Sequence, residues 1–529
     1  MTGSGRTAGG APEVAVDALI ELEPEVENPA LRGQLSQGTL STQVRRGVAW
    51  NAGTRVFEQV LQLAATAILA RVLGPEAYGQ AALVAIVAGF AAIFIDMGIP
   101  GAVIQAPRLD NRLLSTAFWM NLATGIVMAL IVCAVAVPVA RFYGEPELSG
   151  LIMLSSLTFV LSLNAVHVAL MQRALQFKRI GKMTFVTATA GVLTTLGAAL
   201  LGLGAVSLVL GPIASRLVSV IQVQNAVRWW PTAKPSRAAA RSLWAFGGGL
   251  TGFNIVNYAA GSADRFVLGR FVDVTAVGYY GRAVNLMMLP VQQTAGALSR
   301  VFFPAFASMV QDPPRLRRAW LRLVHAAWLL GLPLGVGLAV SAPAAVQVLY
   351  GDQWSAVVPL LVVLSGTIPF LLVSANASPL YQAMGETALQ FRLSMVAAVA
   401  AISLILVGAQ WGALGVAAAV LTRAPVSLAI NLPPLMRRLE VRWRDLVLPL
   451  WRIALAAALM GAAAYGVGLL LSDQPAAVTL AGQVATGGVV YLGLIWPLEQ
   501  RAIRELIGSR KRRGGRARST EEAREADPA

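Results

Sequence analysis

The sequence has few charged residues, few histidines and almost no cysteine. Asp, Glu, Lys and Arg make up 13% of its 529 residues, whereas a soluble globular domain has about 25%. Its single cysteine, Cys133, excludes an intramolecular disulfide and a cysteine metal cluster. The two histidines, His167 and His325, lack metal-site spacing, and we expect each to be a packing residue. The sequence therefore predicts no metal centre and no cofactor.

The short motifs of nucleotide-driven and hydrolytic proteins are also missing. There is no GxxxxGK[ST] phosphate loop, no HExxH pair and no GxSxG turn. The connections between apolar stretches are too short to fold into a catalytic domain. We therefore expect no catalytic residues and no enzyme activity. Any transport would be driven by a substrate gradient, an ion gradient or the membrane potential.

Apolar residues make up most of the chain. The hydrophobic share is 56% and the mean hydropathy is +0.65. A membrane-spanning helix needs about 20 mainly apolar residues, and a backbone in lipid must satisfy its own hydrogen bonds. The sequence thus predicts an all-α polytopic membrane protein with about fourteen spans. These centre on 48–70, 79–105, 113–140, 148–171, 180–201, 204–227, 243–268, 277–304, 319–345, 354–376, 388–408, 412–436, 449–471 and 476–497.

The net charge of +16 follows membrane topology and does not indicate nucleic-acid binding. With a cytoplasmic N-terminus, the connections on that side hold most basic loop residues, including Arg437 and Arg438. The opposite connections hold little beyond Arg71, Arg141 and Arg270. Because basic residues gather on the cytoplasmic side of membrane proteins, both termini are predicted to be cytoplasmic. The basic flanks would attract anionic membrane lipids.

A repeat relates the two halves of the chain at a spacing of 199 residues. Segment 69–79 reads LARVLGPEAYG, and segment 268–278 reads LGRFVDVTAVG. Six predicted helices separate the two copies. Because six is an even number of membrane crossings, both copies face the same way in the membrane. This pattern indicates a parallel duplication related by an axis along the membrane normal, as in many transporters.

The repeat and the charge pattern divide the chain into two lobes with additional segments. The additional segments are two solvated tails, a linker between the lobes and a final helix pair. The expected boundaries are 1–44 for a disordered tail, 45–228 for the N-lobe, 229–241 for the linker, 242–437 for the C-lobe, 438–498 for the final helix pair and 499–529 for a basic and acidic tail.

Polar residues form one face of the first predicted helix. Asn51, Arg55, Glu58 and Gln62 are spaced by four, three and four residues, which places them on one side of a helix. A charged residue at mid-membrane costs roughly 2.5–3.5 kcal/mol on insertion scales, so its presence calls for a structural or functional explanation. We expect this stripe to face a central cavity and bind substrate. The alternative is a structural ion pair between Arg55 and Glu58.

The matching helix of the second half carries a similar stripe. A shift of 199 residues brings Arg55 onto Asn254 and Glu58 onto Asn257, and Asp264 and Arg265 follow on the same helix. Asn254 and Asn257 are predicted to bind substrate across the cavity from the first stripe. Asp264 and Arg265 are candidate coupling or gating residues.

The remaining candidates lie on the second helix of each half. Arg282 and Asn285 share one helix face, and Arg282 has no acid in its own helix, so it is a candidate for binding an anionic group such as phosphate. Asp96 is the only acid of its predicted helix. It would either titrate during transport or cap the break at residues 98–101.

Several segments resemble the Wzx-type oligosaccharide flippases, nearest their colanic-acid exporter branch, in the MOP superfamily that also holds MurJ and the MATE exporters. The resemblance covers about residues 45–500. It rests on GVAW at 47–50, segment 69–79, DMG at 96–98, ADRFVLGR at 263–270, VGYYGRA at 277–283 and VFFP at 301–304.

The resemblance implies two six-helix lobes around a cationic cavity that opens alternately to each side. It implies an undecaprenyl-diphosphate-linked oligosaccharide as the substrate, moved across the bacterial inner membrane for exopolysaccharide or lipopolysaccharide synthesis. Polymerase and glycosyltransferases of the pathway are implied partners. MurJ-like members use arginines in helices 1 and 8, which Arg55 and Arg282 match here. The final helix pair would form a groove for the lipid tail.

Three other functions remain open at this point. A MATE-like exporter would need an acidic, cation-binding cavity, whereas the stripes here are mixed with a positive balance. A membrane polymerase or glycosyltransferase would need a large external loop or a carboxylate-rich face, and neither is seen. A scaffold without transport activity would tolerate loss of both stripes.

Overall fold

The computed structural model describes residues 40–96, 99–105, 111–174, 176–227, 229–307, 309, 312–375, 377–448 and 450–498. All regular structure within these ranges is helical, which confirms the predicted all-α class. Apart from residues 40–44, the two predicted tails lie outside the described residues.

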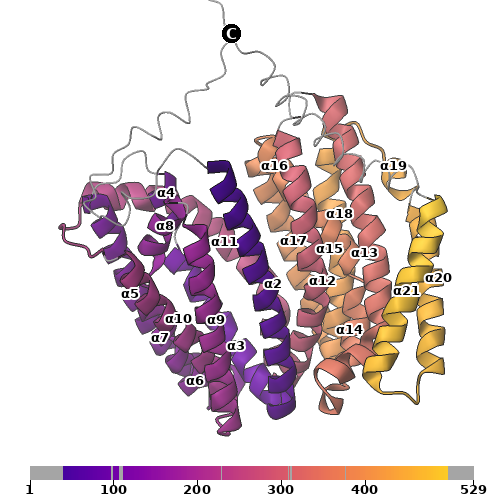
Figure 1. Cartoon of the computed structure of the whole chain (residues 1–529), viewed down its shortest axis with the longest axis horizontal. Coiled ribbons are helices and arrows are strands. Elements are labelled where there is room, and N and C mark those ends of the chain that lie inside the picture. Colours follow the sequence, from indigo (N-terminus) through magenta and orange to yellow (C-terminus); the bar gives the residue numbers. More distant parts are fainter. Residues whose placement is uncertain are drawn as a thin grey trace, which may run out of the picture.

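The helices follow one another in three sets (Figure 1). The first set comprises α2 (Leu40–Val72), α3 (Pro75–Asp96), α4 (Ile99–Gln105), α5 (Asn111–Tyr143), α6 (Leu148–Ser155), α7 (Leu157–Val160), α8 (Ala165–Arg173), α9 (Phe177–Leu200) and α10 (Ala205–Val227). The second comprises α11 (Arg237–Phe271), α12 (Val274–Ala307), α13 (Pro313–Leu349), η3 (Asp352–Trp354), α14 (Val357–Ser365), α15 (Ile368–Ser374), α16 (Ala377–Ala383), α17 (Thr387–Gly408), η4 (Ala409–Trp411) and α18 (Gly412–Arg438). The third comprises α19 (Trp443–Val447), α20 (Leu450–Leu470) and α21 (Ala476–Leu498).

Many of these helices are long and apolar enough to cross a membrane. Eight described helical segments pass this test, or up to ten if each of two bent pairs is one span. One passing segment, Thr387–Arg438, contains both α17 and α18, which pack against each other. Helices α2, α11 and α12, of 33, 35 and 34 residues, are not among those that pass. The chain is thus a multi-pass membrane protein, and the predicted count of fourteen spans is not confirmed.

The first and second sets repeat the same order of packing. Helix α2 packs against α9 and α9 against α10, just as α11 packs against α17 and α17 against α18. Likewise, α3 contacts α6 in the first set, and α12 contacts α14 in the second. In Figure 1, α5–α10 gather at the left and α12–α18 at the right, with α2 between them.

The third set covers the outer side of the second. Helices α20 and α21 pack against each other and against α13. Ile453, Met460 and Ile495 are buried there with Leu329 of α13. The Tyr491 hydroxyl donates a 2.6 Å hydrogen bond to the Leu329 carbonyl. The helix pair therefore adds a further layer beside the second set, and helices α2 to α18 contain the residues predicted to bind substrate.

Candidate functional site

The two halves meet most closely where α3 and α12 begin. A Cβ atom added to Gly79 on α3 would collide with the Val274 carbonyl on α12. A Cβ atom added to Gly278 on α12 would collide with the Pro75 carbonyl on α3. Val274 and Gly278 lie 199 residues after Pro75 and Gly79, so the contact is reciprocal under the sequence repeat. Glycine allows these two backbones to come together.

Other contacts join the halves at the same end of the bundle, which we call the Arg71 end. The Arg71 guanidinium donates to the Val348 carbonyl of α13 at 2.9 Å, and the Trp354 indole donates to the Ala70 carbonyl at 2.8 Å. The equivalent Arg270 lies over the ring of Phe142 on α5, 5.3 Å from its centroid. The end of the first helix in each half thus contacts the third long helix of the other half. These contacts close the Arg71 end.

Arg282 lies one helical turn beyond Gly278 on α12, at the contact with α3. Its guanidinium carbon is 4.2 Å from the centroid of the Tyr78 ring, which is the geometry of a cation–π interaction. Its Nε atom is buried and has no hydrogen-bond partner among the described residues. A buried, unpaired donor on a permanent cation is costly without a ligand. This arrangement suits an anion that reaches Arg282 from between the two halves.

The other predicted substrate-binding residues with described side chains are mostly exposed. Asn254 and Asn257 on α11 and Asn285 on α12 are exposed. Glu58 on α2 is half-buried, and its Oε1 atom is buried without a hydrogen-bond partner among the described residues. Exposed amides within apolar helices are better placed toward water than toward lipid tails. Gln293 of α12 donates to Gln59 of α2 at 3.4 Å, so a side-chain hydrogen bond joins these two helices.

Three predicted residues cannot be placed in the site. The side chains of Asn51, Arg55 and Asp96 lie outside the described residues, although their backbones are helical. Whether Arg55 pairs with Glu58 or faces substrate therefore stays a prediction. Asp96 is the last residue of α3 and α4 begins at Ile99, whereas residues 97 and 98 lie outside the described residues, so both readings of Asp96 stay predictions.

Asp264 and Arg265 lie in a buried polar cluster between α11, α12 and α18. Asp264 is 5% exposed, and its carboxylate accepts 2.7 Å and 2.9 Å hydrogen bonds from the Tyr280 hydroxyl and the Arg265 backbone N–H. Arg423 of α18 donates to the Ala260 carbonyl at 3.3 Å on the same side of α11. Asp264 therefore anchors α12 to α11 through Tyr280, whatever its part in coupling.

Replacing Asp264 with alanine should destabilise the protein by about 1–3 kcal/mol, because the fully buried Tyr280 hydroxyl would lose its acceptor. Asp264→Asn keeps an acceptor and should cost less. Thermal unfolding of the purified protein in detergent would measure both. An alanine variant as stable as the wild type would show that this hydrogen bond does not hold the helices together.

Sequence reasoning missed several residues of this region. Tyr78, whose ring forms the cation–π contact with Arg282, was not predicted. The two residues are 204 positions apart, and no sequence motif links them. The contact role of Gly79 and Gly278 could have been found, because the repeat aligns these glycines without a gap. Among the described residues, no group of three or more His, Cys, Asp or Glu side chains could hold a metal ion.

Comparisons with known proteins identify a family and several relatives. The family model described as "Polysaccharide biosynthesis protein" matches residues 68–359. The chain is 28% identical over 372 residues to the succinoglycan biosynthesis transport protein ExoT of Rhizobium meliloti, covering 70% of this chain and 75% of that protein. It is 26% identical over 433 residues to the lipopolysaccharide biosynthesis protein WzxC of Escherichia coli, covering 81% and 88%. The teichuronic acid biosynthesis protein TuaB of Bacillus subtilis is 25% identical over 482 residues, covering 86% and 96%.

Solved structures of two transporter groups share the fold. The lipid II flippase MurJ, in an inward closed conformation, superposes with a TM-score of 0.68 at 15% identity, covering 86% of this chain and 99% of that chain. An inward-facing multidrug resistance MATE family transporter of the MOP superfamily superposes with a TM-score of 0.51 at 16% identity, covering 72% and 94%. These likenesses confirm the predicted MurJ- and MATE-like fold.

Proposed function

Because the chain belongs to the polysaccharide biosynthesis protein family, whose model matches more than half of its residues, we propose that it is a flippase for lipid-linked oligosaccharides. The substrate would be an undecaprenyl-diphosphate-linked repeat unit. The chain would move it from the cytoplasmic to the outer leaflet of a bacterial inner membrane, for the synthesis of an extracellular or surface polysaccharide. Relatives named for polysaccharide transport and biosynthesis support this class of substrate.

The observation that carries the proposal is the position of Arg282. Its guanidinium lies between the two halves, packed on Tyr78, with a buried Nε that lacks a hydrogen-bond partner among the described residues. A diphosphate is the part of the substrate that a guanidinium binds best, because the two can form paired, charge-assisted hydrogen bonds. The exposed amides of Asn254, Asn257 and Asn285 would hold sugar hydroxyls on the same path.

We propose that the two lobes are residues 45–228 and 242–437 and that they rock against each other. In the structure, the Arg71 end is closed by the Gly79 and Gly278 contacts. With the termini in the cytoplasm, this end would face outward and the structure would correspond to an inward-facing state. The substrate headgroup would reach Arg282 from the cytoplasmic side while its lipid tail stays in the bilayer. Parting of α3 from α12 would then release it outward.

The other parts of the proposal follow from this mechanism. The third helix set, residues 438–498, would supply a lipid-tail groove beside the second lobe. Polymerase and glycosyltransferases of the pathway would be partners, acting on the substrate before and after transport. The chain itself would carry out no covalent chemistry.

The leaflet position of the lipid-linked repeat unit tests the function directly. In a strain lacking this protein, repeat units should accumulate on the cytoplasmic side, protected in intact spheroplasts from an added glycosidase. Re-expression of the chain should restore their access to the enzyme. Repeat units that reach the outer leaflet equally well in the deletion strain would refute the proposal.

A further inference from the structure

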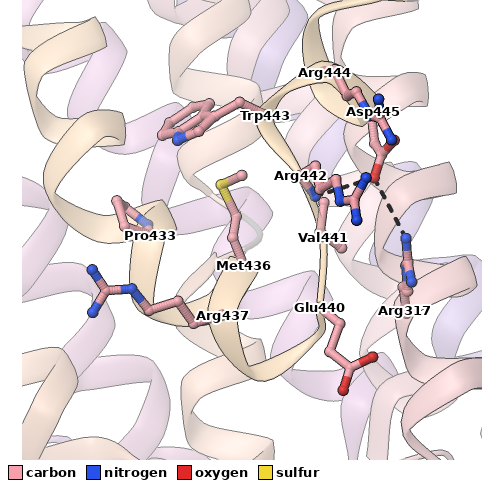
Figure 2. A pocket seen from close by; sticks show the side chains of 10 residues that line it. All are labelled: Arg317, Pro433, Met436, Arg437, Glu440, Val441, Arg442, Trp443, Arg444 and Asp445. Atoms are coloured by element: carbon pink, nitrogen blue, oxygen red, sulfur yellow. Dashed lines mark hydrogen bonds and ion pairs between the residues drawn. The ribbon is translucent and has the colours of Figure 1, made fainter.

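A basic pocket lies where α18 ends and α19 begins, against the start of α13 (Figure 2). Its cavity volume is about 840 Å³. Figure 2 shows Arg437 and Trp443 on one side of the turn and Arg317 on the other. The pocket residues are Arg317, Pro433, Met436, Arg437, Glu440, Val441, Arg442, Trp443, Arg444 and Asp445. None of these residues belongs to the inter-lobe path around Arg282.

The turn at the base of the pocket is held in place by its backbone. Glu440 has a φ of 53°, and the N–H of Val441 donates to the Met436 carbonyl at 2.8 Å, which closes the end of α18. Leu439 and Val441 are buried on either side of Glu440. A non-glycine residue with positive φ is uncommon and costs backbone strain. The chain therefore keeps an acidic side chain beside the pocket where glycine would be easier to accommodate.

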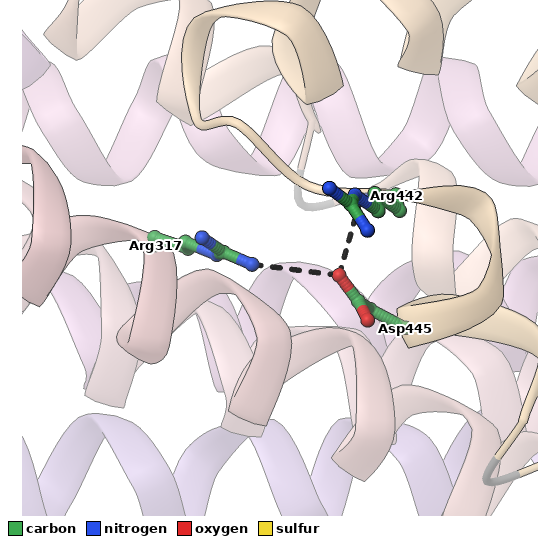
Figure 3. A network of polar contacts seen from close by, with 3 residues as sticks. All are labelled: Arg317, Arg442 and Asp445. Carbon is green, nitrogen blue, oxygen red and sulfur yellow. Dashed lines mark hydrogen bonds and ion pairs between the residues drawn. The ribbon is translucent and has the colours of Figure 1, made fainter.

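Asp445 is already used to build the pocket wall (Figure 3). Its carboxylate accepts from the Arg442 backbone N–H at 3.1 Å, which caps α19, and it forms a 3.4 Å ion pair with Arg317 of α13. The side chains of Arg437, Arg442 and Arg444 form no ion pair in the part of the chain that the structure describes. Four arginines and two acids give the pocket a formal charge of +2. It is therefore suited to an anion.

The surroundings of the pocket place it at the surface of the membrane. Trp443 on α19 and Leu448 and Trp451 beside it are exposed. Tryptophan is enriched at the membrane–water interface, and a short helix that combines arginines with exposed apolar residues lies in that interface. The candidate membrane span that contains α20 begins at Trp443 and ends at Leu470, so the pocket lies at one end of this span. The arginines thus lie at the depth of lipid headgroups.

From this geometry we infer that the pocket binds the phosphate of an anionic membrane lipid. The guanidinium groups of Arg437, Arg442 and Arg444 hold the phosphate, because guanidinium groups match its oxygens in shape and charge. Trp443 packs against the glycerol or prenyl part of the same molecule. The bound lipid holds α18 to α19 and so fixes the third helix set beside the second. This inference does not rest on the proposed function, because any lipid phosphate can supply the chemistry.

Native mass spectrometry of the full chain in detergent, with added phosphatidylglycerol, tests the inference. Arg437→Ala combined with Arg442→Ala should weaken binding by at least about tenfold, since each lost charged hydrogen bond is a large share of the affinity. Arg318→Ala combined with Arg392→Ala removes the same charge from exposed sites outside the pocket and should leave binding unchanged. Glu440→Gln should strengthen binding, because it removes the pocket's unpaired acid.

Two further arms identify the source of the phosphate. Undecaprenyl phosphate that binds more tightly than phosphatidylglycerol, with the same arginine dependence, would support the inference and assign the site to a polyprenyl carrier. Binding of inorganic phosphate without either lipid would overturn it. Equal lipid binding by the pocket variant and the control variant would also overturn it. Should the double variant fail to fold, unchanged binding by Glu440→Gln would be the contradicting result.

Discussion

Polymer export should fall by roughly tenfold to a hundredfold when Arg282 is replaced by alanine, while the protein remains in the membrane at its normal level. The guanidinium lies between α3 and α12, where it has a cation–π contact with Tyr78 and a buried Nε donor without a hydrogen-bond partner among the described residues. A hydrogen bond to a charged group contributes about 1.5–3 kcal/mol, and 1.4 kcal/mol corresponds to about a tenfold change in binding. Loss of one or two such bonds to the diphosphate accounts for the expected decrease.

Matched variants separate this effect from a general loss of charge. Arg282→Lys keeps the cation but cannot form paired hydrogen bonds, so it should export at an intermediate rate. Arg141→Ala removes an exposed arginine at the Arg71 end and should export normally. Surface polymer and membrane-bound protein would be quantified for each strain. Full export by Arg282→Ala at wild-type protein levels would remove Arg282 from the mechanism.

Replacing Gly278 with alanine should open the Arg71 end. The new methyl group would collide with the Pro75 carbonyl of α3, and this carbonyl belongs to the start of a helix that cannot shift freely. Overpacking of this kind costs about 1–3 kcal/mol, which shifts a two-state equilibrium by roughly 5- to 150-fold. The population with a closed Arg71 end would fall by this factor relative to the population with an open end, and transport would slow because one of the two states that it needs is depleted.

The control for this prediction lies on the same helix. A Cβ atom at Gly281 meets no atom within 4 Å, so Gly281→Ala should leave the conformation unchanged and stabilise α12 slightly. Spin labels at the equivalent positions Val72 and Phe271, in a Cys133→Ala background, would report the distance across the Arg71 end. We expect a longer mean distance in Gly278→Ala only. An unchanged distance in that variant would show that the glycine contact does not close this end.

The sequence predicted the class of the fold because few backbone structures are stable in lipid. Long apolar stretches must be helices, and the 199-residue repeat required two similar halves. The structure shows this similarity at the contact of Gly79 with Val274 and of Gly278 with Pro75. The span count was harder to predict, because α2, α11 and α12 are long helices that carry many polar residues and fall outside a test based on length and hydropathy.

The candidate site could be predicted from the sequence only in part. Helical spacing placed Arg282 and Asn285 on one face, but it could not show that Tyr78 supports Arg282, since that contact depends on how α3 crosses α12. Asp264 was predicted as a possible coupling or gating residue, and its buried hydrogen bond to Tyr280 arises from a contact between neighbouring helices that no spacing rule describes. The repeat does show that Arg282 has no counterpart in the first half, because the equivalent position is Leu83.

Transport in reconstituted vesicles most directly tests whether Arg282 carries a lipid diphosphate between the two halves. Vesicles containing the purified chain and an undecaprenyl-diphosphate-linked oligosaccharide would be treated with an external glycosidase, and the fraction of oligosaccharide cleaved would be followed over time. With wild-type protein, cleavage should pass one half and approach completion, whereas with Arg282→Ala it should stop near one half. Complete cleavage at the wild-type rate with the variant would contradict the mechanism.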